Sequence, residues 1–132
     1  MFFPNWGLAL AVLGAAGGVG VGSDGAFSTA DVARAWLNRL PAGMVWTAER
    51  EAYRVLLERA SMGFSSGAEP GFDLAECAKN RFSDWIGAQI RADLYGWVLA
   101  GRPGLAADLA RRDASLSHQG DGVYGAAFVA AL

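Results

Sequence analysis

The residues whose types and spacing could do chemistry gather near the end of the chain. Ser117 and His118 precede a glycine-rich turn at 120–122, which an apolar helix-like segment at 123–132 follows. Free backbone amides at a helix start, beside an imidazole, suit an anion such as a phosphate group. The alternative is a tight turn between two helices that holds a buried histidine with satisfied nitrogens. Residue type alone favours this alternative.

Two glycine-rich runs, at 14–20 and at 120–125, resemble the phosphate loop of a nicotinamide dehydrogenase. In such a loop the glycines let the backbone approach a pyrophosphate at a helix N-terminus. The loop should follow a β-strand and open a helix, whereas both runs follow helix-like sequence. We therefore expect ordinary loops at both places. The hypothesis that the chain is part of a nicotinamide-dependent oxidoreductase depends only on the run at 14–20.

Groups for catalysis or metal binding are scarce. Ser117 beside His118 is not a nucleophile–base arrangement. One cysteine, Cys77, and one histidine exclude a disulfide framework and the usual cysteine–histidine metal clusters. Mg²⁺ stays possible because it needs only carboxylates and water. However, the carboxylates are dispersed and no Asp-Asp pair occurs, so local sequence assembles no two-metal site.

The helices that position these residues can be predicted from their end signals. Ser28 or Thr29 is suited to cap a helix that ends before Pro41, and Pro103 is suited to begin another. No alternating run is long enough for a strand, so we expect an all-α fold. The expected helices span 28–39, 47–60 (capped by Thr47), 84–98, 103–117 and 123–132, with a loop at 61–72 and a short turn or helix at 73–79.

The helix expected at 47–60 has one apolar face and several charges. We expect Glu49 to be solvated together with the neighbouring charged residues of this helix. The residues expected on the inner face are Tyr53, Leu56, Leu57 and Ala60.

The helix expected at 84–98 carries few polar residues. Its expected apolar stripe consists of Ile86, Ile90, Leu94 and Trp97. Gln89 and Asp93 lie on a neighbouring face, and Arg91 lies at the opposite edge. A helix with so little polar surface should be buried, so these three polar groups must be paired inside the protein or face a cleft.

The composition points to helices that are buried on most of their faces. Apolar residues make up 53% of the chain, glycine contributes 18 more of the 132 residues, and only 18% are charged. An ordinary soluble domain has about 45–50% apolar residues with glycine included, and a short chain has little interior. We expect a single partial domain over 1–132 that can self-associate through exposed apolar faces. The net charge of −2 excludes a broad basic surface for nucleic acid.

The start of the chain bears on membrane insertion. No charge occurs from Met1 to Ser23, but Pro4 interrupts this stretch and glycines crowd its end. A signal peptide would begin with basic residues, which are missing. We expect a buried helix over about 7–16, a loop at 17–26, no membrane partner and a cytoplasmic protein. The closing residues 129–132 lack a polar tail, so we expect a fragment of a longer protein.

Three segments of the last third resemble the ADP-ribosylglycohydrolase family, which includes the dinitrogenase reductase-activating glycohydrolases. They are residues 85–97 (WIGAQIRADLYGW), 107–118 (ADLARRDASLSH) and 122–131 (GVYGAAFVAA). Residues 29–37 with Leu40-Pro41 are similar to the middle helices of the same family. The resemblance covers 27–132, which we expect to be a segment of the family's orthogonal helical domain, whereas 1–26 is a divergent apolar and glycine-rich start.

The resemblance implies a hydrolase that cleaves the glycosidic bond between ADP-ribose and a protein side chain or small acceptor, in a cleft with two Mg²⁺ ions. The family's glycine-rich substrate segment is matched by residues 87–91, although Ile86 replaces its asparagine. The family's helix-end histidine, near the phosphates or ribose, is matched by His118. The implied substrate-binding residues are Gly87, Ala88, Gln89, Arg91, His118, Gly122 and Tyr124.

The family's metal-ligand motifs, Thr-Asp-Asp near its start and Asp-x-Asp-Thr near its end, do not occur in this sequence. We therefore expect a fragment that carries part of the ADP-ribose pocket and is inactive alone. The alternative is a non-catalytic helical ADP-ribose-binding or interaction remnant. If His118 contacts ADP-ribose, it should be partly accessible in a concave pocket that Gly87 and Gln89 also border. If it is a core residue, it should be buried and bonded to a backbone carbonyl or Asp113.

Overall fold

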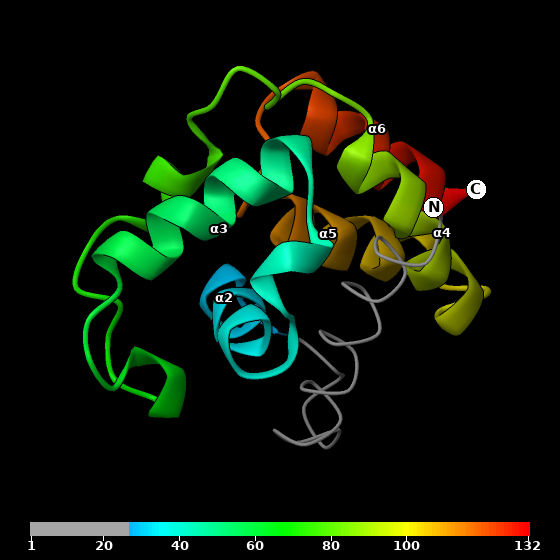
Figure 1. Cartoon of the computed structure of the whole chain (residues 1–132). Helices are drawn as coiled ribbons and strands as arrows, with labels where there is room; N and C mark the ends of the chain where they lie inside the picture. Colours follow the sequence, from blue (N-terminus) through cyan, green and yellow to red (C-terminus); the bar gives the residue numbers. More distant parts are fainter. Residues whose placement is uncertain (1–26) are drawn as a thin grey trace.

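The computed structural model describes residues 27–132, and this part of the chain is built from helices without a β-strand (Figure 1). The all-α prediction is therefore confirmed. The helix expected over about 7–16 and the glycine-rich loops at 14–20 and 17–26 lie outside the described residues. The elements are α2 (Thr29–Arg39), η1 (Ala42–Met44), α3 (Thr47–Arg59), η2 (Phe64–Ser66), η3 (Leu74–Ala78), α4 (Gly87–Val98), α5 (Pro103–Ala114) and α6 (Asp121–Ala131), where η denotes a short 3₁₀ helix.

Helix α2 begins and ends where its sequence signals predict. Ser28 is the N-cap: its hydroxyl accepts a hydrogen bond from the Asp31 amide, and the Asp31 carboxylate accepts one from the Ser28 amide. This reciprocal capping box satisfies two amides that the first turn leaves without helical partners. At the other end, Leu40 is extended and Pro41 follows it. The inward face contains Val32, Ala35 and Trp36, as expected.

Helix α3 differs from its prediction in its cap and in its inner face. Thr47 is the first helical residue, and the N-cap is Trp46, which makes no side-chain cap hydrogen bond. Leu57, expected inside, is 57% exposed, whereas Glu49, expected in solvent, is 3% exposed. The buried residues of α3 are Ala48, Glu49, Ala52, Tyr53 and Leu56. The buried face of α3 therefore includes Glu49 instead of Leu57, because the Glu49 carboxylate has a partner in the interior.

Helices α4, α5 and α6 form a closely packed group in which α6 lies against both of the others. A Cβ on Gly96 of α4 would lie 2.8 Å from the Ala130 carbonyl oxygen, and one on Gly125 of α6 would lie 2.9 Å from the Gln89 Oε1. Glycine at these positions lets the helix backbones approach more closely than larger side chains would allow. Gly96 and Gly125 are therefore used in helix packing.

The helix boundaries and the buried face in this group correct the sequence-based expectations. Helix α4 begins at Gly87 instead of residue 84, and α5 ends at Ala114 instead of residue 117. Ile86 and Trp97, expected in the apolar stripe of α4, are 62% and 61% exposed. The buried residues of α4 are Ala88, Arg91, Ala92 and Tyr95. The helix thus turns its arginine inward, which follows from the ion pairs described below.

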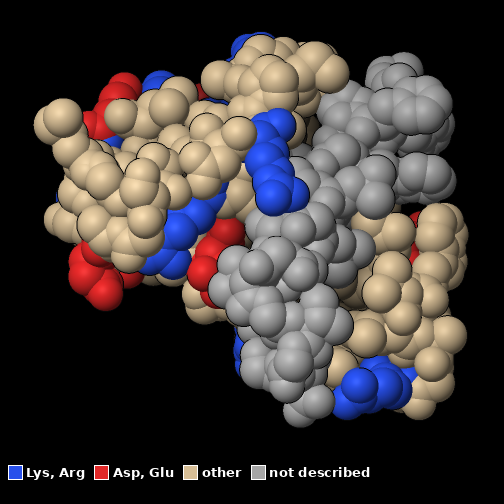
Figure 2. Space-filling model, turned by 90° about the horizontal axis from the view of Figure 1, so that it is seen from below, with Lys and Arg blue, Asp and Glu red and all other residues tan. Residues whose placement is uncertain are grey.

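Apolar side chains also remain on the surface. Trp97, Val98, Phe128 and Leu132 are exposed near the last turns of α4 and α6. In the view of Figure 2, uncharged residues form most of the described surface and the charged side chains lie in small separate groups. None of the helices within 27–132 has both the length and the apolar character needed to cross a membrane.

We predict that Gly96→Ala lowers the free energy of unfolding by about 1–2 kcal/mol, because the added methyl group would push α4 away from the Ala130 carbonyl. The matched control is Gly104→Ala in α5, where a Cβ would meet nothing within 4 Å. There the substitution should be neutral or stabilising, because alanine favours helix over glycine. Urea denaturation measures both values. Equal stabilities for the two variants would show that α4 and α6 do not pack this closely.

Candidate functional site

A buried arginine joins three helices in the interior. The Arg91 guanidinium of α4 donates to the Glu49 carboxylate of α3 through Nη1, at 2.7 Å. Through Nε and Nη2 it donates to Asp113 of α5, at 3.2–3.3 Å. The side chains of all three residues are at most 3% exposed. The planar guanidinium can serve two carboxylates at once, because its N–H groups point in fixed, divergent directions.

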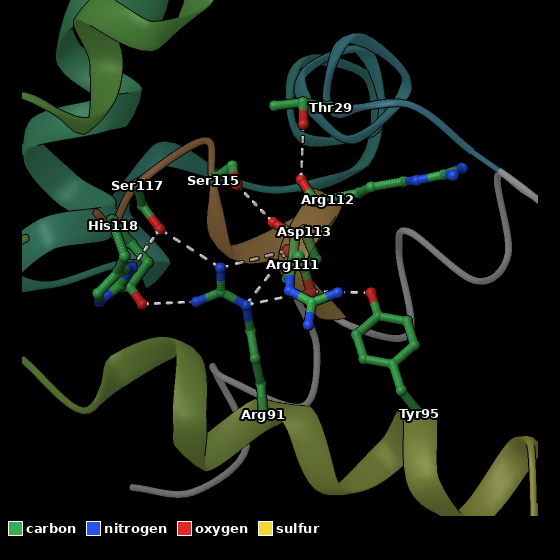
Figure 3. A network of polar contacts seen from close by, with 10 residues as sticks. Thr29, Arg91, Tyr95, Arg111, Arg112, Asp113, Ser115, Ser117 and His118 are labelled. Atoms are coloured by element: carbon green, nitrogen blue, oxygen red, sulfur yellow. Dashed lines mark hydrogen bonds and ion pairs between the residues drawn. The ribbon is translucent and has the colours of Figure 1, made fainter. Parts of the chain in front are cut away.

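Two hydroxyl groups complete this network (Figure 3). The Tyr95 hydroxyl donates to Asp113 Oδ2 at 2.8 Å, and Arg91 Nη2 lies 3.3 Å from Ser117 Oγ. Burial, together with the negative charge of Asp113, raises the pKa of Tyr95 far above its ordinary value. Burial lowers the pKa of Arg91, but the charges of Asp113 and Glu49 outweigh this and raise it. The arginine therefore stays charged and the tyrosine stays protonated.

The network contains two carboxylates and one guanidinium. When both carboxylates are ionised, it carries a net charge of −1 in the interior. Burying charge is costly unless it is paired and hydrogen-bonded. The sequence makes room for Glu49 by placing glycine opposite it: a Cβ on Gly87 would lie 2.5 Å from the Glu49 Oε1. Gly87 thus shapes the network without taking part in it.

His118 lies at the edge of this network, in the turn between α5 and α6. It is 1% exposed, and its Nδ1 lies 2.6 Å from the Ser117 Oγ. Burial, with a smaller contribution from the charge of Arg91, lowers the pKa of His118 to about 3. The imidazole is therefore neutral near pH 7. Because Arg91 donates to the Ser117 oxygen, the Ser117 hydroxyl hydrogen is available to Nδ1. We assign the ring hydrogen to Nε2 on this ground, since the hydrogen-bond network and not the heavy-atom positions defines the tautomer.

The Nε2 atom of His118 is buried and has no hydrogen-bond partner within the described part of the chain. An unsatisfied buried donor costs about 1–3 kcal/mol. Such a group in a folded protein calls for an explanation. In this case the ring also belongs to the wall of a cavity.

That cavity, of about 410 Å³, lies at the turn between α5 and α6. Its wall includes Ser115, His118, Gln119, Gly120 and Tyr124, with Ala75, Ala78 and Val123. Gly120 has φ +51° and ψ −122°, a conformation that side-chain-bearing residues rarely adopt. The glycine therefore allows the sharp entry into α6 beside the histidine.

The loop before α4 holds this turn in place. The Asn80 side chain donates to the Ser117 carbonyl at 3.1 Å, and the Gln119 amide donates to the Ser83 carbonyl at 3.0 Å. Gly122 is also buried at this contact. A Cβ at this position would clash with the Ser83 carbonyl and crowd the His118 ring, so only glycine fits. The turn is thus held by a loop that lies more than 30 residues earlier in the sequence.

A second cavity, of about 150 Å³, lies between the start of α3 and the start of α4. Its wall includes Glu49 and two tryptophans, Trp46 and Trp85, which are 51% and 52% exposed. Gly87 and Ile90 also line it, together with Thr47 and Ile86. The two cavities thus contact the buried network through different residues, His118 and Glu49.

The structure brings together some of the residues expected to bind ADP-ribose. His118 and Tyr124 line the larger cavity, and Gly122 packs beneath the His118 ring. The others lie elsewhere: Gly87 lines the smaller cavity, and Gln89 packs against Gly125 of α6.

Two of the expected substrate residues turn their side chains into the interior. Ala88 is 2% exposed and Arg91 is 1% exposed, and Arg91 is engaged by its two carboxylates. The partial accessibility expected for a ligand-binding His118 is also not found, because the ring is buried. The bond expected for a core histidine is not found either, because the Nδ1 partner is Ser117 instead of a carbonyl or Asp113.

Sequence reasoning missed Glu49 as a partner of Arg91. Its signal was present, because residues 49, 52, 53 and 56 recur at helical spacing and lie on one face. The glutamate was assigned to solvent by its type, although Arg91 on a nearly apolar helix already required an interior partner.

The described residues do not fit the Mg²⁺ ions that the family resemblance implies. Between residues 27 and 132, no group of three or more His, Cys, Asp and Glu side chains lies close enough to hold a metal ion. Comparisons with known protein families, with curated proteins and with solved structures find no match for this chain.

We predict that Arg91→Met lowers the free energy of unfolding by about 3–5 kcal/mol, because it leaves two buried carboxylates without their cation. Arg54→Met is the matched control, since Arg54 pairs with Glu51 and Glu58 on the exposed surface of α3. That change should have little effect on stability. Urea denaturation followed by circular dichroism measures both variants. Similar small losses for the two would contradict the burial of Arg91.

We also predict that His118 makes the protein less stable in mild acid. Its pKa is about 3 in the folded protein and about 6.5 in the unfolded chain. Below pH 6.5 the unfolded chain binds a proton that the folded protein does not, so stability falls as pH falls. Between pH 7 and pH 5.5 this linkage removes about 1 kcal/mol. In His118→Phe that part of the slope should vanish, and unchanged slopes would refute the assignment.

Proposed function

We propose that this chain carries part of the ADP-ribose pocket of a hydrolase of the ADP-ribosylglycohydrolase type. The observation that supports it most is that His118, which lines the cavity at the α5–α6 turn, has a buried Nε2 without a partner among the described residues. The helices around this turn come from the three segments that carry the family resemblance. In the full hydrolase the glycosidic bond to ADP-ribose is the bond cleaved, and the expected location is the cytoplasm.

The chemistry of the cavity suits a ribose hydroxyl or a phosphate oxygen. A neutral imidazole with its hydrogen on Nε2 donates one hydrogen bond and adds no charge. A ligand oxygen that accepts this bond removes the cost of the unsatisfied donor. Because the ring is buried, the wall must yield slightly for the oxygen to reach it. Gln119 and Gly120, in the same wall, are exposed to solvent.

Tyr124 provides a second contact of a different kind. It is 67% exposed and lines the same cavity from the first turn of α6. An exposed aromatic ring offers a surface on which an adenine or ribose ring can pack, and its hydroxyl group can donate or accept a hydrogen bond. Its role in the proposal is to hold the ligand against the turn.

We predict that His118→Phe weakens ADP-ribose binding about 10- to 100-fold, the range for a lost hydrogen bond to a charged oxygen. Phenylalanine keeps the ring volume and removes the donor. Isothermal titration of the full chain with ADP-ribose measures the affinity, and a thermal melt of each variant checks folding.

Two exposed aromatic residues of α6 provide a test that does not depend on folding. Tyr124→Ala should weaken binding, whereas Phe128→Ala, one turn further on and outside the cavity, should leave it unchanged. The proposal is overturned if ADP-ribose does not bind saturably, or if both alanine variants bind like the original chain. Turnover of an ADP-ribosylated peptide with Mg²⁺ by this chain would contradict the expectation that it is inactive alone.

A further inference from the structure

The smaller cavity combines a buried carboxylate with two half-exposed tryptophans. Glu49 forms part of its wall, with Trp46 directly before α3 and Trp85 two residues before α4. We propose that this cavity binds the methylated ammonium group of an organic cation. The inference does not rest on the ADP-ribose proposal, because the two cavities have no lining residue in common.

The charge balance of the network favours a cation at this place. Within the described part of the chain, Glu49 and Asp113 share the single guanidinium of Arg91, so when both carboxylates are ionised one of the two negative charges has no ion-pair partner. Within residues 27–132, the hydrogen bond to Glu49 comes from Arg91 and is made to Oε1, so Oε2 has no donor of its own. The carboxylate can therefore attract a positive group in the cavity while it remains paired to the arginine.

The tryptophans supply the second element of recognition. The face of an indole ring attracts a cation through its quadrupole, and tryptophan is the best of the aromatic residues in this respect. Trp85 is held by an edge-on contact with Phe82, with ring centroids 4.7 Å apart. Both indoles are half-exposed, so a ligand can contact them without unfolding the wall.

The remaining wall selects against other cations. The aliphatic side chains of Ile86 and Ile90 line the cavity, and a metal ion or a primary ammonium would lack the oxygen ligands or acceptors that it needs there. A methylated ammonium has no such requirement, because it has few or no N–H groups. The volume of about 150 Å³ far exceeds the roughly 10–15 Å³ that a single water requires.

Gly87 keeps this space open. A Cβ at this position would lie 2.5 Å from one Glu49 oxygen and 3.1 Å from the other. Any side chain here would therefore displace the carboxylate or fill the cavity in front of it. The same glycine that leaves room for the Arg91–Glu49 pair thus leaves room for a ligand.

The test compares choline with 3,3-dimethylbutan-1-ol, which has nearly the same shape and carries no charge. Tryptophan fluorescence and isothermal titration of the full 132-residue chain measure both affinities. We expect saturable binding of choline, at least about threefold tighter than that of the neutral analogue. Equal affinities would overturn the proposal, since they would show that the cavity recognises apolar shape and not positive charge. Absence of saturable choline binding at millimolar concentrations would overturn it as well.

Tryptophan variants locate the binding site. Trp46→Leu and Trp85→Leu should each weaken choline binding about 2- to 30-fold. Trp97→Leu is the matched control, because Trp97 is similarly exposed and lies outside this cavity. An equal effect of all three changes would overturn the assignment. Tighter binding of a trimethyllysine peptide than of choline would identify the natural source as a modified protein, and the reverse would identify a small metabolite.

Discussion

The burial of Arg91 is the constraint on which the rest of this structure depends. A guanidinium taken out of water must find anionic partners in the interior, and here they come from α3 and α5. The resulting ion pairs fix the rotation of α4, the inward turn of Glu49 and the position of Tyr95. A buried ion pair adds little net stability compared with apolar packing. Its effect here is on arrangement, because these contacts tie α3, α4 and α5 to one another through a single guanidinium.

The same network contacts both cavities for which a ligand is proposed. On one side, Arg91 donates to Ser117, and the burial of His118 together with the charge of Arg91 lowers the histidine pKa and keeps the imidazole neutral. The histidine therefore presents an N–H donor, which complements an oxygen. On the other side, Glu49 presents a carboxylate oxygen between two tryptophans, which complements a cation. The two proposed ligand groups, an oxygen acceptor near His118 and a cation near Glu49, are thus both argued from one set of buried polar groups.

The helices could be predicted from the sequence, because their signals are local. The capping box at Ser28, the stop at Pro41 and the start at Pro103 lie where the structure has helix ends. The inner faces of α3 and α4 could not be predicted in the same way. The partners of Arg91 lie 42 and 22 residues away from it in sequence, and periodicity ranks a charged residue as solvated. Because α4 has many apolar residues, its sequence is compatible with burial of either face, and it does not show which face is turned inward.

The candidate site was predicted only in part, and for a related reason. His118 and Tyr124 share a cavity because they flank one turn, which is local information. Gly87 and Arg91 were joined to them by resemblance alone. In the structure Gly87 faces a different cavity, and Arg91 is used in the interior. Which face of α4 looks toward α6 is decided by the close approach of Gly96 to Ala130 and of Gln89 to Gly125, which no local pattern reveals.

An orphaned buried donor is not by itself evidence of a binding site, as a second example in this protein shows. The indole Nε1 of Trp36 also lacks a partner among the described residues. It belongs to the apolar core, where the ring stacks on Tyr53. No cavity described here includes Trp36 in its wall, and its cost is offset by the burial of a large ring. His118 differs because it lines a cavity and its Nδ1 already has a partner. The proposed ligand oxygen would meet the one ring nitrogen that the described residues leave without a partner, whereas nothing can reach Trp36 without disrupting the core.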